Sequence, residues 1–140
     1  MNEELNKKPT SGIAVDGYCD QSTNRGGYKG IDISTGEILF QRNYSYTTNN
    51  ICEFLAVCHA LGYNKKNNSE YGIIFTDSQV AISWLRNQKI NSGINMEKGK
   101  DVLEDVGKCI RWISEQKRLT PVVKWETKVW GEIPADFGNK

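Results

Sequence analysis

The pattern of apolar and polar residues in the first third of the chain predicts three strands. Ile13 to Val15 is a short apolar run that stops at Asp16-Gly17, and a second stretch from Tyr28 to Ile33 follows a glycine-containing loop. The segment from Ile38 to Tyr46 is rich in β-branched and aromatic residues and alternates in part, as expected of a strand. We expect these three strands to form an antiparallel meander.

Beyond Ile51 the apolar residues recur at the spacing of a helix, which is expected to stop in the asparagine-rich stretch after Gly62. The near-continuous apolar run from Tyr71 to Phe75 suits a strand that is buried on both faces. A second helix follows this strand directly, because apolar residues return at helical spacing from Val80 onward. A third helix is predicted at about Gly99–Lys117, where that spacing resumes after a polar stretch.

The last strand is predicted from Val122 to Trp125, directly after Pro121. The order of elements is then βββαβααβ, which indicates an α/β (α+β mixed) protein with a five-stranded mixed sheet and flanking helices. In such sheets, ligands gather at the carboxyl ends of the strands, near a switch in strand order. We expect a single domain over residues 12–140, preceded by a flexible polar leader at residues 1–11.

Composition limits the partners and the location of the protein without identifying either. Lys and Arg total 18 against 17 Asp and Glu, so only a local patch of charge can attract nucleic acid. The first residues lack the apolar core of a signal peptide and no apolar run is long enough for a membrane span, so we expect a cytoplasmic location and no membrane partner. The cysteines form no CxxC pair, which favours reduced thiols over a zinc site. They are Cys19, Cys52, Cys58 and Cys109.

Four acidic residues are candidates for chemistry, and three of them lie at boundaries of predicted elements. Asp16 lies at or near the end of the first strand, Asp77 follows the fourth strand, and Glu53 lies in the first turn of a helix, while Asp136 is close to the C-terminus. The first three also have purely structural explanations. Asp16-Gly17 fits a turn, Asp77 fits the cap of the following helix, and Asn50-Ile-Cys-Glu53 has the spacing of a capping box.

The residues around these carboxylates form blocks that resemble, in order, the signatures of type 1 ribonuclease H. The resemblance extends from about Ile13 to Asp136, and the second and third acidic blocks together are far more specific than a lone carboxylate. The blocks are Ile13-Ala-Val-Asp16-Gly-Tyr-Cys, Arg25-Gly-Gly-Tyr28, Thr47-Thr-Asn-Asn50-Ile-Cys-Glu53-Phe-Leu-Ala56 and Thr76-Asp77-Ser-Gln79.

The resemblance implies a ribonuclease H fold and an endonuclease that cuts the RNA strand of RNA–DNA hybrids. The four catalytic carboxylates of the family correspond to Asp16, Glu53, Asp77 and Asp136, which are expected to hold two Mg²⁺ ions, with Mn²⁺ as an alternative metal. Two such cations stabilise the attacking water and the leaving oxygen of an in-line displacement, so the expected products carry 5′-phosphate and 3′-hydroxyl ends.

The resemblance also implies a set of substrate-binding residues. It places Asn50 and Gln79 beside the minor groove of the hybrid, where amides can read the 2′-hydroxyl, and Asn49 in the same loop. Cys19 corresponds to a position that often contacts the DNA strand, and Gly17 lies between it and the first carboxylate. Capping and turn formation are the alternative for the amides, and simple burial is the alternative for the Cys19 thiol.

The chain departs from the family pattern at two places. Many relatives carry a histidine in the loop before the last aspartate, whereas the only histidine here is His59, which we expect to serve packing or to lie at the surface. The final helix of the family is expected to be truncated, because only four residues follow Asp136. These departures leave two other functions open: a nucleic-acid-binding module with weakened turnover, and a nuclease for a DNA junction or double-stranded RNA.

We expect a monomer with no protein partner.

Overall fold

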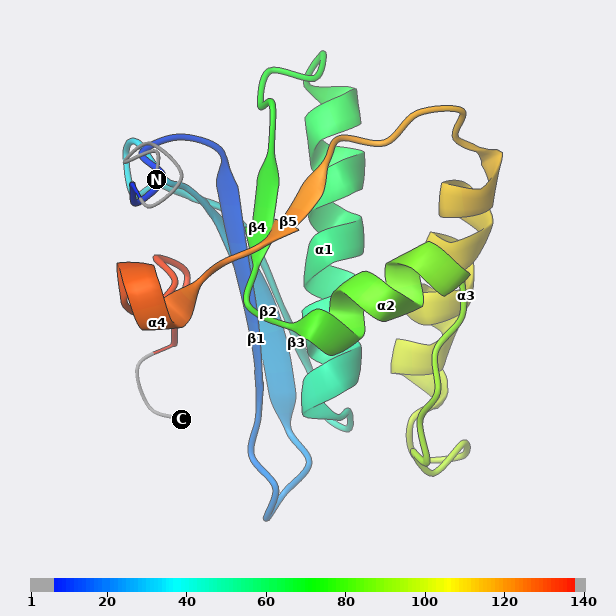
Figure 1. Cartoon of the computed structure of the whole chain (residues 1–140). Helices are drawn as coiled ribbons and strands as arrows, with labels where there is room; N and C mark the ends of the chain where they lie inside the picture. Colours follow the sequence, from blue (N-terminus) through cyan, green and yellow to red (C-terminus); the bar gives the residue numbers. More distant parts are fainter. Residues whose placement is uncertain (1–6, 138–140) are drawn as a thin grey trace.

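The computed structural model describes residues 7–137, in which five strands form one sheet and the three longer helices lie on one side of it (Figure 1). The leader predicted at residues 1–11 lies mostly outside the described residues. The strands are β1 (Ile13–Cys19), β2 (Gly26–Asp32), β3 (Ile38–Tyr44), β4 (Ile74–Thr76) and β5 (Val122–Lys124). The helices are α1 (Asn49–Lys66), α2 (Gln79–Asn87), α3 (Lys100–Glu115) and α4 (Thr127–Trp130).

The sheet is mixed, with the strand order β3-β2-β1-β4-β5. The first three strands pair antiparallel to one another, whereas β4 pairs parallel to β1 and β5 pairs parallel to β4. The predicted meander and the predicted order βββαβααβ are therefore confirmed, with the short helix α4 added after the last strand. Because the chain returns to the other side of β1 when it forms β4, the strand order reverses between these two strands.

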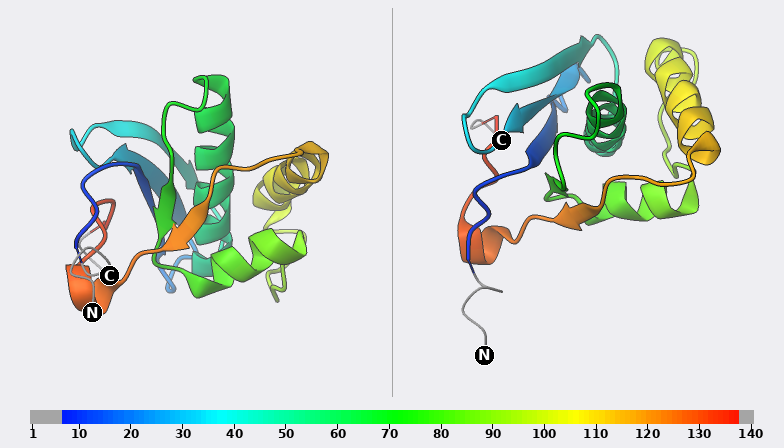
Figure 2. Two further views of the ribbon diagram at one scale, coloured as in Figure 1. Left: turned by 45° about the horizontal axis from the view of Figure 1, so that its top comes forward. Right: turned by 90° about the horizontal axis from the view of Figure 1, so that it is seen from above.

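Alternation along β1 divides the interior into two apolar clusters, one on each face of the sheet. Ile13 and Val15 belong to the larger cluster beneath α1, while Ala14 belongs to a smaller cluster with Phe75 and Trp125 on the opposite face. Helix α1 is buried over most of its circumference, because it lies between the sheet and the helices α2 and α3 (Figure 2). Helix α4 and the C-terminal segment cover the opposite face of the sheet (Figures 1 and 2).

Several predicted boundaries were wrong. Strand β1 does not stop at Asp16-Gly17 but continues to Cys19, because both residues stay paired with β2. Strand β4 begins at Ile74 rather than Tyr71, because both backbone groups of Tyr71 are bonded to the Asn64 side chain of α1. Helix α4 forms where the sequence pattern predicts no element, because four residues are too few for a periodic pattern to reveal a helix.

None of the helices formed by residues 7–137 is both long enough and apolar enough to cross a membrane.

Candidate active site

The parallel pairing of β1 and β4 brings two of the predicted carboxylates side by side. The ladder ends with Val15 opposite Thr76, so the next residue on each strand is an aspartate, Asp16 on one and Asp77 on the other. Beyond this point β4 ends and the chain turns into α2, whereas β1 continues with β2 as its partner. The two aspartates therefore lie at the carboxyl end of β4, at the switch in strand order where ligands of such sheets bind.

Helix α1 brings the third carboxylate to the same place through a close approach to β1 at Gly17. A Cβ atom on Gly17 would lie 2.8 Å from the backbone N of Glu53 and 2.9 Å from Cβ of Cys52, closer than such atoms tolerate. Only a glycine allows the helix and the strand to pack this tightly. The close contact places Glu53 next to Asp16, one residue before Gly17.

Neither Glu53 nor Asp77 caps a helix, because other side chains supply the caps of α1 and α2. Thr48 caps α1, its hydroxyl accepting a hydrogen bond from the Ile51 N–H at 3.2 Å, and Ser78 caps α2 in the same way from Ala81 at 3.0 Å. Glu53 therefore lies in the second turn of α1, not in the predicted first turn, and does not belong to a capping box. Asp16 is inside a strand and Asp77 precedes the cap of α2.

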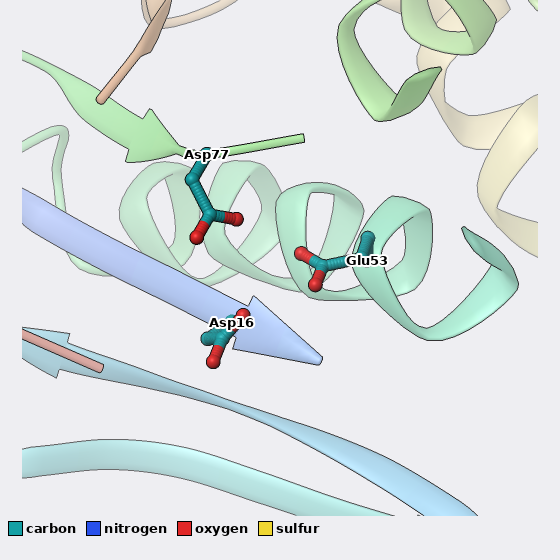
Figure 3. A group of neighbouring side chains, drawn as sticks. All are labelled: Asp16, Glu53 and Asp77. Atoms are coloured by element: carbon teal, nitrogen blue, oxygen red, sulfur yellow. The ribbon is translucent and has the colours of Figure 1, made fainter. Parts of the chain in front are cut away.

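The three carboxylates converge at short range (Figure 3). One carboxylate oxygen from each of Asp16, Glu53 and Asp77 lies within 4.8 Å of the other two. Asp16 is fully buried and Glu53 is 4% exposed, while Asp77 is half-buried. Oxygen Oδ1 of Asp16 and oxygen Oε2 of Glu53 are shielded from solvent. Three negative charges this close repel one another, and an all-oxygen donor set is the one that Mg²⁺, Mn²⁺ and similar hard cations prefer, so the residues fit a divalent metal centre.

A comparison with known protein families identifies the family of this chain. The family model for RNase H matches residues 9–126, a segment that contains all three clustered carboxylates. The chain belongs to the RNase H family. It is therefore a hydrolase of the ribonuclease H type, and the resemblance drawn from the motifs is confirmed.

The chain is similar to two solved structures at low sequence identity. The N-terminal RNase H domain of a Mycobacterium tuberculosis protein, solved as a fusion with maltose-binding protein, superimposes with a TM-score of 0.51 at 14% identity, covering 81% of this chain and 86% of that one. RNase H1 from the halophilic archaeon Halobacterium salinarum NRC-1 gives a TM-score of 0.48 at 15% identity, covering 84% of this chain and 86% of that one. The first likeness confirms the predicted ribonuclease H-like fold.

In this ribonuclease H the fourth predicted carboxylate, Asp136, does not belong to the group within 4.8 Å, and it lies after the segment that the family model matches. It is half-buried, and its N–H donates to the carbonyl of Ile133 at 2.9 Å in a tight turn. The residues on either side of it are fixed, because Ala135 is fully buried and the Phe137 ring packs on Tyr18. The turn thus places Asp136 against the sheet face that also carries Asp16.

The amides predicted to bind substrate lie at the starts of the two helices that border the carboxylates. Asn49 and Asn50 are the first two residues of α1, Gln79 is the first of α2, and all three side chains are exposed. Thr48 and Ser78 cap α1 and α2, so these amides do not have the alternative role as helix caps. The amides face solvent within a few residues of the metal-binding candidates.

The other residues singled out in the sequence have packing roles in the structure. The half-buried Cys19 thiol donates to the carbonyl of Thr47 at 3.4 Å, and burial raises the pKa of Cys19. His59 stacks on Phe40 with ring centroids 4.0 Å apart and lies 2.8 Å from the Tyr28 hydroxyl through Nδ1, so the expected packing role is confirmed. All four cysteines are free thiols.

Two aromatic residues and a lysine near the carboxylates were not recognised from the sequence. Lys29 is the direct partner of Asp16 on β2, and Tyr18 and Phe137 contact each other beside it. The register of the β1–β2 hairpin would have located Lys29 if the strand had been predicted at its full length. Nothing in the sequence pattern signals the contact of Phe137, because it joins segments more than a hundred residues apart.

Proposed function

We propose that this ribonuclease H cuts the RNA strand of RNA–DNA hybrids and that Asp16, Glu53, Asp77 and Asp136 hold two divalent cations for the reaction. The observation that carries the proposal is the convergence of three carboxylates from a strand, a helix and a strand–helix junction to within 4.8 Å. Burial of two of them favours their use as metal ligands, since buried like charges are costly without a cation.

The carboxylates would hold the cations, and the cations would in turn bind a phosphate of the substrate. When bound, Mg²⁺ or Mn²⁺ supplies charge that stabilises the attacking water and the leaving 3′ oxygen of an in-line displacement. The expected products carry a 5′-phosphate and a 3′-hydroxyl. Asp77 is the half-buried member of the cluster and therefore faces the side from which a substrate arrives.

In this proposal, the side-chain amides at the starts of α1 and α2 determine the substrate specificity. Asn50 and Gln79 read the 2′-hydroxyl of the RNA strand in the minor groove, and Asn49 supports the loop that carries Asn50. Their exposure and their closeness in sequence to Glu53 and Asp77 support this role. Gly17 and Cys19 lie in the second half of β1, close to the start of α1, where the DNA strand is expected. The enzyme is expected to act as a monomer.

A cleavage assay tests the proposal directly. End-labelled RNA–DNA, RNA–RNA and DNA–DNA duplexes of one sequence are incubated with the protein in Mg²⁺, in Mn²⁺ and in EDTA, and the fragment ends are identified by ligation and by extension. We expect cleavage of the RNA strand of the hybrid alone, only with metal. Asp101→Asn, on the exposed face of α3, is the matched control for substitutions in the cluster. Binding of the hybrid without cleavage, or cleavage of another duplex, contradicts the proposal.

A further inference from the structure

The sheet face opposite α1 is covered by the end of the chain and not by a long helix. After α4, residues 131–137 form neither helix nor strand, yet Ile133 and Ala135 are buried to 1% and 0% exposure in the smaller apolar cluster. The indole N–H of Trp125 donates to the carbonyl of Gly131 at 2.8 Å, at the start of the same segment. Side chains, rather than backbone ladders, therefore fix this segment to the sheet.

Phe137, the last residue that the structure describes, contacts the same sheet face near Asp16. Its ring centroid lies 4.5 Å from that of Tyr18, and Nζ of Lys29 lies 4.7 Å above the same ring. Tyr18 follows Asp16 by two residues on β1, and Lys29 is directly opposite Asp16 on β2. Residues two apart on a strand and residues directly paired across strands share a face, so Tyr18, Lys29 and Asp16 all lie on the face that Phe137 covers.

We propose that Phe137 is a positioning residue for Asp136: its ring, which contacts Tyr18 and Lys29, holds the Asp136 carboxylate at the proposed metal site. Asp136 lies between two anchored residues, the buried Ala135 and the sheet-bound Phe137, and adjacent Cα atoms are only about 3.8 Å apart. The segment has no regular structure, and the aromatic and cation–π contacts of Phe137 join the turn bond from Asp136 to Ile133 in fixing the backbone from which this carboxylate extends.

This inference rests on the proposed function, because it assigns a support to the fourth metal ligand of that proposal. Residues that orient a metal ligand without touching the metal typically change metal affinity or activity by about 10- to 100-fold when removed. We expect the same for Phe137→Ala. A role in folding alone would lower the unfolding temperature and leave metal affinity unchanged.

The test measures Mn²⁺ binding by titration calorimetry, with unfolding temperatures recorded in EDTA, for the wild type and six variants, one of which is Asp16→Asn. Phe137→Ala and Asp136→Asn are each expected to weaken Mn²⁺ binding, whereas Phe137→Tyr should retain the wild-type affinity. The double variant with Phe137→Ala and Asp136→Asn should bind Mn²⁺ no more weakly than Asp136→Asn alone, because the two residues act as one unit. Val129→Ala, at the exposed surface of α4, is the control for a general effect on this segment.

The outcomes separate the two proposals. Wild-type Mn²⁺ affinity in Phe137→Ala, or losses that add fully in the double variant, overturns the positioning role. If the wild type itself binds no Mn²⁺, or if Asp16→Asn binds it as tightly as the wild type does, the metal site and the proposed function fail instead. If Asp16→Asn loses binding while Phe137→Ala does not, the proposed function stands and only the inference is overturned.

Discussion

Carboxylate side chains lie beside the sheet in two regions of this molecule, and the groups that surround the carboxylates differ between the two regions. On α3, Asp105 accepts a hydrogen bond from the Tyr44 hydroxyl at 2.6 Å and lies 3.3 Å from the guanidinium of Arg42. At the end of β4, three carboxylates converge on one another. In the first region the chain supplies the balancing charge and the donor, whereas in the second it collects like charges, which favours cations from solution.

The carboxylate of Asp105 has a donor and a cation of the chain as partners and serves stability, whereas the clustered carboxylates serve catalysis under the proposed function. The Arg42 and Asp105 side chains are 52% and 21% exposed, so solvent screens their ion pair and the pair itself contributes little. The hydrogen bond from the buried Tyr44 contributes more, and burial together with this bond raises the pKa of Tyr44. Substitutions in the two regions should therefore have opposite signatures.

The largest expected effect is the loss of catalysis in Asp77→Asn. This change removes one negative charge from the cluster at nearly constant volume, so metal binding and cleavage of an RNA–DNA hybrid should fall by roughly a thousandfold or more, equivalent to several kcal/mol. Stability in EDTA should stay the same or rise, because the remaining carboxylates repel each other less. Gel assays in Mg²⁺ and thermal unfolding measure the two quantities. Hybrid cleavage at the wild-type rate would show that Asp77 is not a metal ligand.

The second largest effect is expected in the other region, with the opposite signature. Asp105→Ala leaves the buried Tyr44 hydroxyl without its acceptor, which should reduce the free energy of unfolding by about 1–3 kcal/mol. Cleavage of the hybrid below the unfolding transition should be unchanged. Glu104→Ala, at an exposed position of α3, is the control and should stay within about 0.5 kcal/mol of the wild type. A catalytic defect in Asp105→Ala without loss of stability would erase the distinction between the two regions.

A smaller effect is expected from the exposed amides, which belong to the catalytic region but hold no metal. Asn50→Ala and Gln79→Ala should each slow hybrid cleavage by roughly two- to tenfold, the equivalent of one hydrogen bond, with metal affinity intact. Asn87→Ala, at the far end of α2, is the matched control.

A chemical substitution in the substrate sharpens that test. Deoxyribose or a 2′-O-methyl group at the contacted nucleotide should slow the wild type to a similar extent, and the loss should not multiply with that of the amide variants. Fully multiplicative losses would mean that these amides do not read the 2′-hydroxyl.

The sequence was sufficient for the fold and for the three clustered carboxylates, and the reasons lie in local patterns. Periodicity and strand composition located every strand and the three longer helices, since each depends on residues close together in the chain. The motif blocks around Asp16, Glu53 and Asp77 added the family. The capping and turn alternatives could not be rejected at that stage, because Thr48 and Ser78 are as suitable as caps as their neighbours and only the backbone path decides.

What the sequence missed depends on contacts between distant segments. The Asp16-Gly17 pair is typical of a turn, but Gly17 lies inside β1, where its missing side chain admits helix α1. The contact of Phe137 with Tyr18 joins residues 18 and 137, and no periodic pattern reports it. Asp136 is a candidate in the sequence through its place near the C-terminus and through the resemblance, and the structure does not add it to the three-residue cluster.

The smallest expected effect is a pH dependence of stability from His59, in the region where the chain balances its own charges. Burial, and secondarily the positive charge of Arg42, lower the pKa of His59 in the folded protein. The imidazole packs on Phe40 and lies 2.8 Å from the hydroxyl of Tyr28, so protonation places a second positive charge among groups arranged for a neutral ring.

The sign of the pH effect follows from this lowered pKa. In the unfolded chain His59 binds a proton near its ordinary pKa of about 6.5, while the folded protein resists protonation until the pH is lower. The unfolded state therefore holds more protons in that window, so stability falls as the pH drops below about 6.5, by at most about 1.4 kcal/mol per pH unit for a single proton. Urea unfolding in EDTA between pH 7.5 and 5.5, for the wild type and for His59→Asn, isolates this contribution, because the carboxylates titrate in both. The variant should be less stable at pH 7.5 but lose stability more slowly on acidification. Parallel curves would mean that His59 takes up its proton equally in both states and that Arg42 does not act on the ring.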